Sequence, residues 1–310
     1  MRIGLTGGGS TIERIVEQAV QAEADGFASM WLPGAVAGDA LLPISHAGKA
    51  TTSIELGTAV LPTYLCHPVL QANRAEAVVA SMGRPGLVLG VGPSHQPVVE
   101  GSLGLSYDHP GRHTEEYVTI LTSLLAGETV DFRGEDHQVR AQPSGMAQPI
   151  TGGEPIPVLV AALGSRLLRV AGERAAGTIL WMANARAVES HVAARITRAA
   201  KSAGRPAPRI VAGLPVAVHD DIDEARQVAA SQFEVYGQLP NYQRILEHGE
   251  VAGPAEAAII GDEAAVEAQI RQLFAAGATD VWAAPFPVGG DRKASRQRTH
   301  DLLVGLAAAS

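Results

Sequence analysis

The sequence is poor in cysteine and in aromatic residues. Cys66 is the only cysteine among 310 residues, and aromatic residues make up 4% of the chain. A single cysteine excludes an internal disulfide and a cysteine-based zinc cluster. The few aromatics, together with 34 glycines, indicate close packing of helices against strands.

A basic excess and a long apolar run are also missing. The chain has 24 Lys and Arg against 32 Asp and Glu, a formal net charge of −8, which argues against nucleic acid and anionic membrane as partners. No uncharged apolar run reaches the ~18 residues of a membrane-spanning helix. The opening residues turn to glycine before a signal peptide could form. We therefore expect a cytoplasmic protein with a sizeable core.

Motifs for hydrolysis and for metal binding are absent as well. The histidines are scattered; His109 and His113 have the i, i+4 spacing, but Pro110-Gly111 between them argues against a helix there. The sequence has no acidic cluster on matching strand ends and no Gly-x-Ser-x-Gly elbow. We expect no metal site, and a cofactor that brings its own reactivity fits better than acid–base hydrolysis.

What the sequence does contain is a repeated alternation of strand and helix. Strands are expected at 3–5, 27–31, 54–60, 87–92, 157–160, 177–181, 209–218 and 280–284. Eight such units predict a (β/α)8 TIM barrel with insertion segments, as a single domain over residues 1–310. A doubly wound sheet also alternates, but the number of units and the lack of an early Gly-x-Gly-x-x-Gly favour the barrel.

Capping and turn residues indicate where several of these elements begin and end. Ser10-Thr11-Ile12-Glu13 fits a capping box, and Gly83 is expected to end the helix over 69–82. The polar segment 93–112 is predicted to be a long, functional loop before a helix over 115–125. A β-hairpin is expected at 129–139, and 240–253 is interpreted as an insertion.

In a TIM barrel the site lies at the carboxyl ends of the strands. The apolar run from Leu87 ends in Gly90, Gly92, Ser94 and His95. The glycines leave room for close backbone approach, and a histidine titrates near neutral pH. His95 is the first catalytic candidate; the alternative is a surface histidine on a loop.

Other strand ends supply further candidates. Tyr64 is a second catalytic candidate and His67 a substrate contact, with loop packing as the alternative. Trp31 is a candidate for stacking on substrate, with burial in the core as the alternative. A helix start after Ala161 and Ala162 exposes N–H groups that suit phosphate. Gly164, Ser165 and Arg166 lie there; the alternative is plain capping with a solvated arginine.

Four segments in order carry a family resemblance. Residues 56–63, 88–92, 112–121 and 157–179 resemble the third strand, the fourth strand, the helix after the long loop, and strands five and six of the bacterial luciferase-like family. Its members use flavin or the deazaflavin coenzyme F420. Within the family the chain is most similar to actinobacterial F420-dependent oxidoreductases.

The resemblance implies a barrel with a cofactor ring over a bulge at Ala59-Val60, where related proteins often carry a non-prolyl cis peptide. It also implies a homodimer. The cofactor contacts that it implies are Ala59, Val60, Gly90, Gly92, Ser94, Ala161, Ala162, Gly164, Arg166, Met182 and Asn184.

The chain departs from the sugar-phosphate dehydrogenases of this family in two places. They carry an Asp-His pair after strand two, where this chain has Trp31-Leu32-Pro33-Gly34, and a glutamate after strand four, where it has His95. Their substrate and proton relay are therefore not carried over. The resemblance leads to the hypothesis of hydride transfer between F420 and an unidentified small organic substrate, with His95 exchanging the proton. The alternatives are an FMN-dependent monooxygenase and a non-catalytic flavin- or deazaflavin-binding protein.

Overall fold

A closed parallel barrel organises the chain. The computed structural model describes residues 1–34 and 38–309. Each strand pairs with the next in parallel, and the last pairs with the first. The barrel strands are β1 (Arg2–Thr6), β2 (Ser29–Leu32), β3 (Glu55–Thr58), β5 (Leu87–Gly92), β8 (Val158–Val160), β9 (Gly177–Trp181), β10 (Arg209–Val218) and β12 (Asp280–Pro285). The predicted TIM barrel is confirmed, and the doubly wound alternative is excluded.

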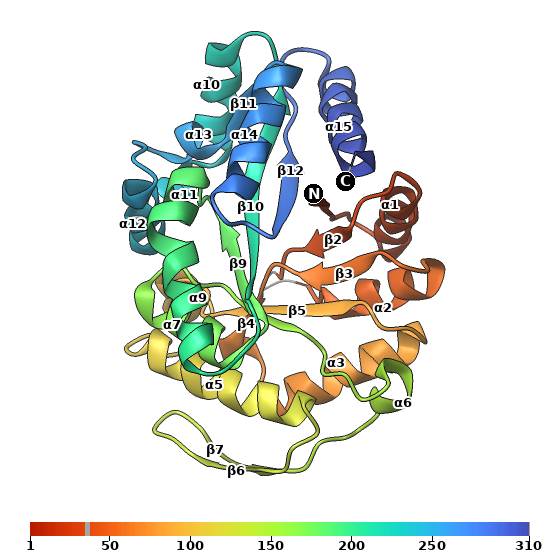
Figure 1. Ribbon diagram of the computed structural model, residues 1–310, viewed down its shortest axis with the longest axis vertical. Coiled ribbons are helices and arrows are strands. Elements are labelled where there is room, and N and C mark those ends of the chain that lie inside the picture. The colour runs from red at the N-terminus through yellow and green to blue at the C-terminus, as the bar shows by residue number, and fades with distance from the viewer. Residues whose placement is uncertain (35–37, 310) are drawn as a thin grey trace.

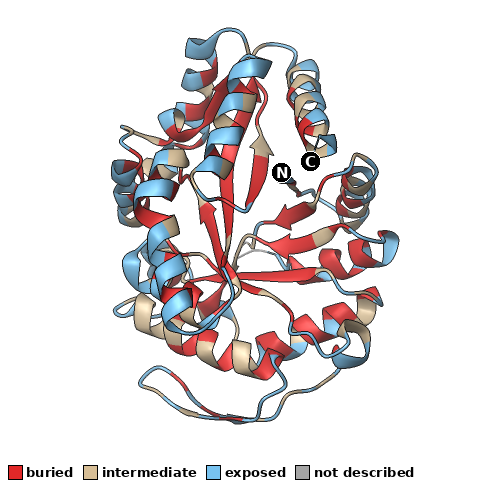
Figure 2. Cartoon of the chain, in the orientation of Figure 1, coloured by how far each residue is buried: buried red, intermediate tan, exposed pale blue. Residues whose placement is uncertain are grey.

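Helices cover the outside of the barrel (Figure 1). They turn a buried face to the strands and an exposed face to solvent, as Figure 2 shows, which is the usual pattern of an amphipathic helix. The longer ones are α1 (Ile12–Ala24), α2 (Leu41–Ala50), α3 (Pro68–Met82), α5 (Pro110–Leu125), α7 (Ser165–Arg174), α9 (Ala194–Ser202), α10 (Ile222–Gln232), α14 (Glu263–Ala275) and α15 (Arg292–Ala308).

Shorter elements lie between these. A small antiparallel hairpin, β6 and β7, projects beside α5 as predicted (Figure 1). The remaining elements are β4 (Leu61–Pro62), a 3₁₀ turn (Thr63–Leu65), α4 (Gln96–Gly101), β6 (Val130–Arg133), β7 (Gln138–Ala141), α6 (Gln148–Thr151), α8 (Ala185–Ala187), a π-helix (Val188–Ala193), α11 (Glu234–Gly237), α12 (Pro240–His248), α13 (Pro254–Ala257) and β11 (Ile259–Gly261).

Two helix starts differ from the sequence expectation. Thr11, not Ser10, caps α1, because its hydroxyl accepts from the N–H of Arg14. Helix α5 begins at Pro110, although Pro110-Gly111 was expected to exclude a helix between His109 and His113. Proline is tolerated in the first turn of a helix, since its missing N–H has no intrahelical partner there.

Two tryptophan side chains, each packed against a glycine on a neighbouring strand, lie in the barrel interior. A Cβ on Gly57 would lie 2.3 Å from the Trp31 ring, and one on Gly213 would lie 2.0 Å from Trp282. The two glycines therefore leave the space that the two indoles occupy. Both indoles are buried, and Trp181 lies next to Trp282 with ring centroids 5.1 Å apart. Trp181 is the last residue of β9 and is half-buried. The packed interior of the barrel therefore ends at Trp181 on the side of the carboxyl ends of the strands.

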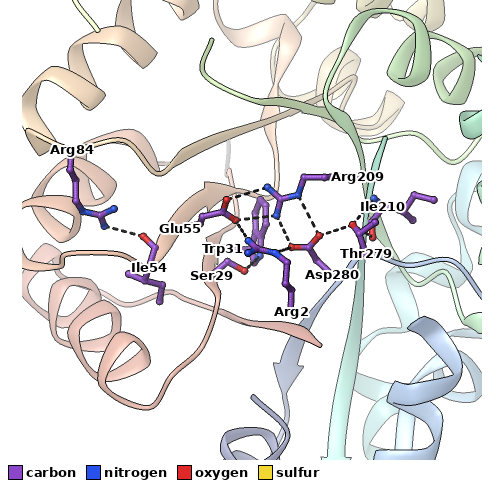
Figure 3. Close-up of polar contacts among 10 residues, drawn as sticks. All are labelled: Arg2, Ser29, Trp31, Ile54, Glu55, Arg84, Arg209, Ile210, Thr279 and Asp280. Carbon is purple, nitrogen blue, oxygen red and sulfur yellow. Dashed lines mark hydrogen bonds and ion pairs between the residues drawn. The ribbon is translucent and has the colours of Figure 1, made fainter. Parts of the chain in front are cut away.

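An ion-pair network closes the other end of the barrel (Figure 3). Arg209 Nη2 lies 2.6 Å from Asp280 Oδ1 and 3.0 Å from Glu55 Oε2. Arg2 pairs with the same two carboxylates. These residues begin β1, β3, β10 and β12, so the network joins four strands at their amino ends. The accessible site is therefore confined to the carboxyl ends.

Candidate active site

A bulge interrupts the third barrel strand where the cofactor was expected. The Ala59–Val60 peptide is cis, as the resemblance implies, and it separates β3 from β4. The bulge is tied to β5, since Thr58 Oγ1 donates to the carbonyl of Gly90 (2.8 Å) and accepts from its N–H (2.9 Å). Ala59 and Val60 remain half-buried. The bulge therefore leaves part of these two residues accessible to solvent.

Gly90 and Gly92 let neighbouring backbone approach β5 closely, and their expected contact with a cofactor stays a prediction. A Cβ on Gly90 would lie 1.9 Å from the carbonyl oxygen of Thr58, and one on Gly92 would lie 2.7 Å from the Cβ of Ala161. Both glycines are buried. The room that they leave is occupied by the bulge and by the end of β8, so they support the site by packing.

Ser94 and His95 follow β5 in a fixed loop. Ser94 has a left-handed backbone (φ 61°), which is unusual for a residue other than glycine. Its carbonyl accepts a hydrogen bond of 2.9 Å from the Tyr107 hydroxyl. Backbone strain of this kind is often found at functional sites. It therefore supports the loop at Ser94 and His95 as part of the candidate active site.

His95 lies half-buried at the start of α4, and its ring faces Tyr242 with centroids 5.7 Å apart. Its Nδ1 is buried without a hydrogen-bond partner. Burial lowers the pKa of the imidazole below 6.5, because desolvation disfavours the charged form. His95 is therefore neutral at pH 7 and able to accept a proton, and it is not a freely solvated surface histidine.

Tyr64 lies in a ring cluster next to this loop. Its ring stacks on His113 at 4.0 Å and lies 5.6 Å from Tyr107, the residue that holds Ser94. Burial, followed by the charges of Asp136 and Asp108, raises the pKa of Tyr64 to about 12. The hydroxyl therefore stays protonated at neutral pH, which suits a hydrogen-bond donor and not a base.

No side chain caps the first N–H groups of α7. Gly164 is the cap residue and has no side chain; Ser165 and Arg166 beside it are exposed. This arrangement fits an anionic group. Arg166, however, pairs with Glu115 at 2.9 Å, and Arg169 pairs with the same carboxylate. Its charge is therefore already matched within the protein.

The two candidates after β9 differ in what they offer. Met182 is buried with a left-handed backbone (φ 62°), so the chain turns sharply there. Asn184 caps α8, because its Oδ1 accepts from the N–H of Ala187 and its amide donates to the carbonyl of Gly249. The carboxamide thus joins the start of α8 to Gly249, and its expected place near the cofactor stays a prediction.

Two proposed substrate contacts also have structural roles. Trp31 is fully buried, and its indole donates a 2.8 Å hydrogen bond to Ser29. It belongs to the barrel core, the alternative that the sequence left open, and has no accessible surface for a substrate. His67 is exposed, and its Nδ1 accepts from the N–H of Val69 at the start of α3.

Sequence reasoning placed Trp181 at the carboxyl end of a strand but missed Tyr236 and Tyr242. Tyr236 and Tyr242 come from α11 and α12, in the segment after β10, and their rings lie 4.9 Å apart. Tyr236 lies 5.9 Å from Trp181 and Tyr242 lies near His95. One signal was available: Phe233, Tyr236 and Tyr242 fall close together in a chain that has few aromatics.

Unpartnered buried polar atoms test whether a cofactor fits here. Four of the buried side-chain atoms without a hydrogen-bond partner belong to residues at or just after the carboxyl ends of strands, and a buried polar atom normally has a partner. A bound polar heterocycle would supply partners in this position, so the residues present fit such a group. The atoms are Thr6 Oγ1, Thr63 Oγ1, His95 Nδ1 and Trp181 Nε1.

Two other classes of site are not seen. Among residues 1–34 and 38–309, no group of three or more His, Cys, Asp or Glu side chains is arranged to hold a metal ion. None of the helices described is both long enough and apolar enough to span a membrane.

Comparison with known proteins identifies the family. The family model for luciferase-like monooxygenases matches residues 2–294. The chain belongs to this family. The matched range includes all eight barrel strands, the bulge at Ala59-Val60 and the loop at Ser94.

Proteins similar to this chain are named for different activities. The chain is 25% identical to 5,10-methylenetetrahydromethanopterin reductase of Methanolobus tindarius, over 94% of this chain and 86% of the relative. It is 27% identical to F420-dependent glucose-6-phosphate dehydrogenase of Nakamurella multipartita, over 82% and 76%. The FMN complex of a type II Baeyer–Villiger monooxygenase from Pseudomonas putida has the same fold, with a TM-score of 0.74, 16% identity and coverage of 100% and 98%.

Proposed function

We propose that this protein is an F420-dependent oxidoreductase and that His95 exchanges the proton that accompanies hydride transfer. When bound, the deazaflavin supplies or takes up the hydride. The observation that carries the proposal is His95 itself: its Nδ1 is buried without a partner just after β5, and burial lowers the pKa of the imidazole. A neutral imidazole in that position accepts a proton from a substrate that is being oxidised.

The chain's own groups have separate tasks in this proposal. The backbone of Ala59 and Val60 and the loop at Ser94 border the ring. The uncapped N–H groups at the start of α7 receive an anionic group. Tyr64 stays protonated and donates a hydrogen bond. Relatives named for F420 support the choice of cofactor.

Titration of the purified protein with F420 and, separately, with FMN tests the cofactor. We expect F420 to bind with a change in its fluorescence and FMN to bind more weakly. Tight binding of FMN alone, with oxygen-dependent turnover, would support the monooxygenase alternative. Binding of either cofactor without turnover of any substrate in a broad panel would support a non-catalytic binding protein.

His95→Gln tests the proton exchange. Turnover should fall by about 10²- to 10⁴-fold, the usual contribution of a general acid or base, while the dissociation constant of the cofactor stays within about twofold of wild type. In the direction of substrate oxidation, the wild-type rate should fall as the pH drops through the lowered pKa of His95, because protonation removes the base. The variant should lack this acidic limb. An unchanged rate and pH profile in the variant would refute the role of His95.

We also propose that the protein is a homodimer, as the family resemblance implies. Light scattering coupled to size-exclusion chromatography measures the mass directly; a mass near 32.2 kDa, that of one chain, would contradict the proposal.

A further inference from the structure

A cleft lies between the first and the last long helix of the chain. Helices α1 and α15 stand next to each other beside the two chain ends (Figure 1), and the cleft between them has a volume of about 1020 Å³. Its floor includes Leu5 of β1, Met30 of β2 and Pro285 of β12. A cleft of this size is large enough for a small organic molecule.

The cleft lies outside the barrel, apart from the candidate active site. Met30 packs in the core that the strands share with the helices, whereas Trp31 and Trp282 pack in a separate cluster inside the barrel. Of the described residues that line the cleft, none belongs to the bulge at Ala59-Val60 or to the loop at Ser94. A molecule in the cleft would therefore leave the barrel mouth free.

The foot of the cleft is closed and its carboxylates are already bonded. His300 Nε2 of α15 lies 3.2 Å from Asp25 Oδ2, just after the end of α1. Asp25 Oδ1 accepts a 2.8 Å hydrogen bond from Gln21, and Asp301 accepts one of 2.8 Å from Gln297. The two acidic residues that line the cleft thus have partners of their own.

Cations gather at the opposite end. Arg14 lies in the first turn of α1, and Arg292, Lys293 and Arg296 lie in the first two turns of α15. Within residues 1–34 and 38–309, no ion pair or side-chain hydrogen bond involves the three cationic side chains of α15. Arg14 has only an exposed pair with Glu17 at 3.4 Å, and such a pair contributes little. This end therefore carries positive charge that the described part of the chain does not match.

The backbone around these cations is fixed and its helix starts are capped. Asp291 accepts from the first N–H groups of α15, and Thr11 accepts from one of α1. The N–H of Gly8 donates to Gln18 Oε1 (3.0 Å), and Gln18 Nε2 donates to the carbonyl of Gly8 (2.7 Å). An anion at this end would therefore meet the cationic side chains, on a rim whose loop is already held in place.

A cationic end, an apolar floor and a closed foot together define the kind of ligand. We propose that the cleft between α1 and α15 is a second binding site and that it takes a small organic phosphate. The phosphate lies against Arg292, Lys293 and Arg296, since a guanidinium binds phosphate through paired hydrogen bonds, and the uncharged body lies on the floor. The chain as a whole has a net charge of −8, so a long polyanion would be repelled and a small one is favoured.

Two matched probes test the charge requirement. AMP and adenosine differ only in the phosphate. Calorimetric titration of the purified protein without cofactor should show at least about tenfold tighter binding of AMP. Raising the salt from about 50 to about 500 mM should weaken AMP binding and leave adenosine binding unchanged, because salt screens exposed charges. Equal affinity for the two probes would overturn the proposal.

Charge removal on α15 tests the location. The double variant Arg292→Gln and Arg296→Gln should weaken AMP binding by about tenfold or more and leave adenosine binding within about twofold of wild type. Arg198→Gln is the control, since Arg198 is an exposed arginine of α9 that does not line the cleft. An equal loss of AMP binding in the control would mean that net charge alone attracts the phosphate, and the proposal would fail.

A second pair of variants adds charge to the rim. A Cβ on Gly8 meets nothing within 4 Å, so a side chain there begins in open space. Gly8→Glu should weaken AMP binding through repulsion, whereas Gly8→Gln, of the same shape, should have little effect. If AMP binds but responds to neither the α15 variants nor Gly8→Glu, the phosphate is held elsewhere and the proposal is wrong. These measurements use no F420, so they stand or fall separately from the proposed function.

Discussion

At the scale of single residues, the two glycines of β5 show how a short sequence pattern can have two physical explanations. Gly-x-Gly at the end of a buried strand indicated backbone room for a ligand. In the structure the nearest atoms to the missing side chains are those of Thr58, Val60 and Ala161. The glycines are required by the bulge of β3, which must approach β5 closely.

Gly92→Ala is expected to lower the free energy of unfolding by about 1–3 kcal/mol, the usual cost of overpacking a filled interior. The added methyl would lie 2.7 Å from the Cβ of Ala161 and 3.0 Å from Val60 Cγ2. Urea denaturation measures the change. Gly164→Ala is the control, since nothing lies within 4 Å of its added Cβ; equal stability of the two variants would contradict the explanation.

At the scale of secondary structure, the hairpin β6–β7 depends on one buried carboxylate of α5. Glu116 accepts three backbone N–H bonds from the hairpin turn: from Glu135 at 2.9 Å, Asp136 at 2.9 Å and His137 at 2.8 Å. Hydrogen bonds to a charged acceptor are stronger than neutral ones. The hairpin was predicted from Val130, Phe132 and Gly134, but its anchor comes from the preceding helix, 19 residues before Glu135.

Glu116→Gln should loosen the hairpin and leave the barrel folded. The neutral side chain keeps one acceptor oxygen, so at least one N–H loses its partner, at about 1–3 kcal/mol. Amide hydrogen exchange at residues 135–137 should speed up while the strands of the barrel stay protected. Asp131→Asn, at an exposed pair with Arg140, is the control. Unaltered exchange in Glu116→Gln would refute the anchoring role.

At the scale of the whole molecule, the ion-pair network at the amino ends holds together strands that are far apart in sequence. Asp280 is buried, and it binds Arg2, Arg209 and Thr279. Burial raises the pKa of Asp280, but its hydrogen bonds and its pairing with Arg209 outweigh this and lower the pKa overall. The network therefore adds stability at neutral pH.

Asp280→Asn should destabilise the fold by about 3–5 kcal/mol, because it leaves two arginines without a buried partner. The depressed pKa gives the sign of the pH dependence: the stability contributed by Asp280 is present above its unfolded pKa of about 3.9 and is lost as pH falls through the lower folded value. Thermal unfolding of both proteins between pH 7 and pH 3 measures this. A midpoint in the variant equal to that of wild type at pH 7 would contradict the prediction.

Local signals in the sequence determined most of the fold. Strands 87–92, 177–181 and 209–218 have the predicted bounds, because buried parallel strands read as continuous apolar runs. The left-handed Gly83 ends α3 as predicted. The number of units then favoured the barrel, and the family resemblance placed a cis peptide at Ala59-Val60.

Only the tertiary structure decided the roles of individual side chains. Trp31 is buried because Gly57 faces it from the neighbouring strand, and Arg166 is neutralised because α5 brings Glu115 to it. Asn184 is occupied by Gly249, and His95 meets Tyr242, across long stretches of chain. Local sequence specifies the conformation of the backbone, whereas a side chain's role depends on neighbours that the closed barrel brings together.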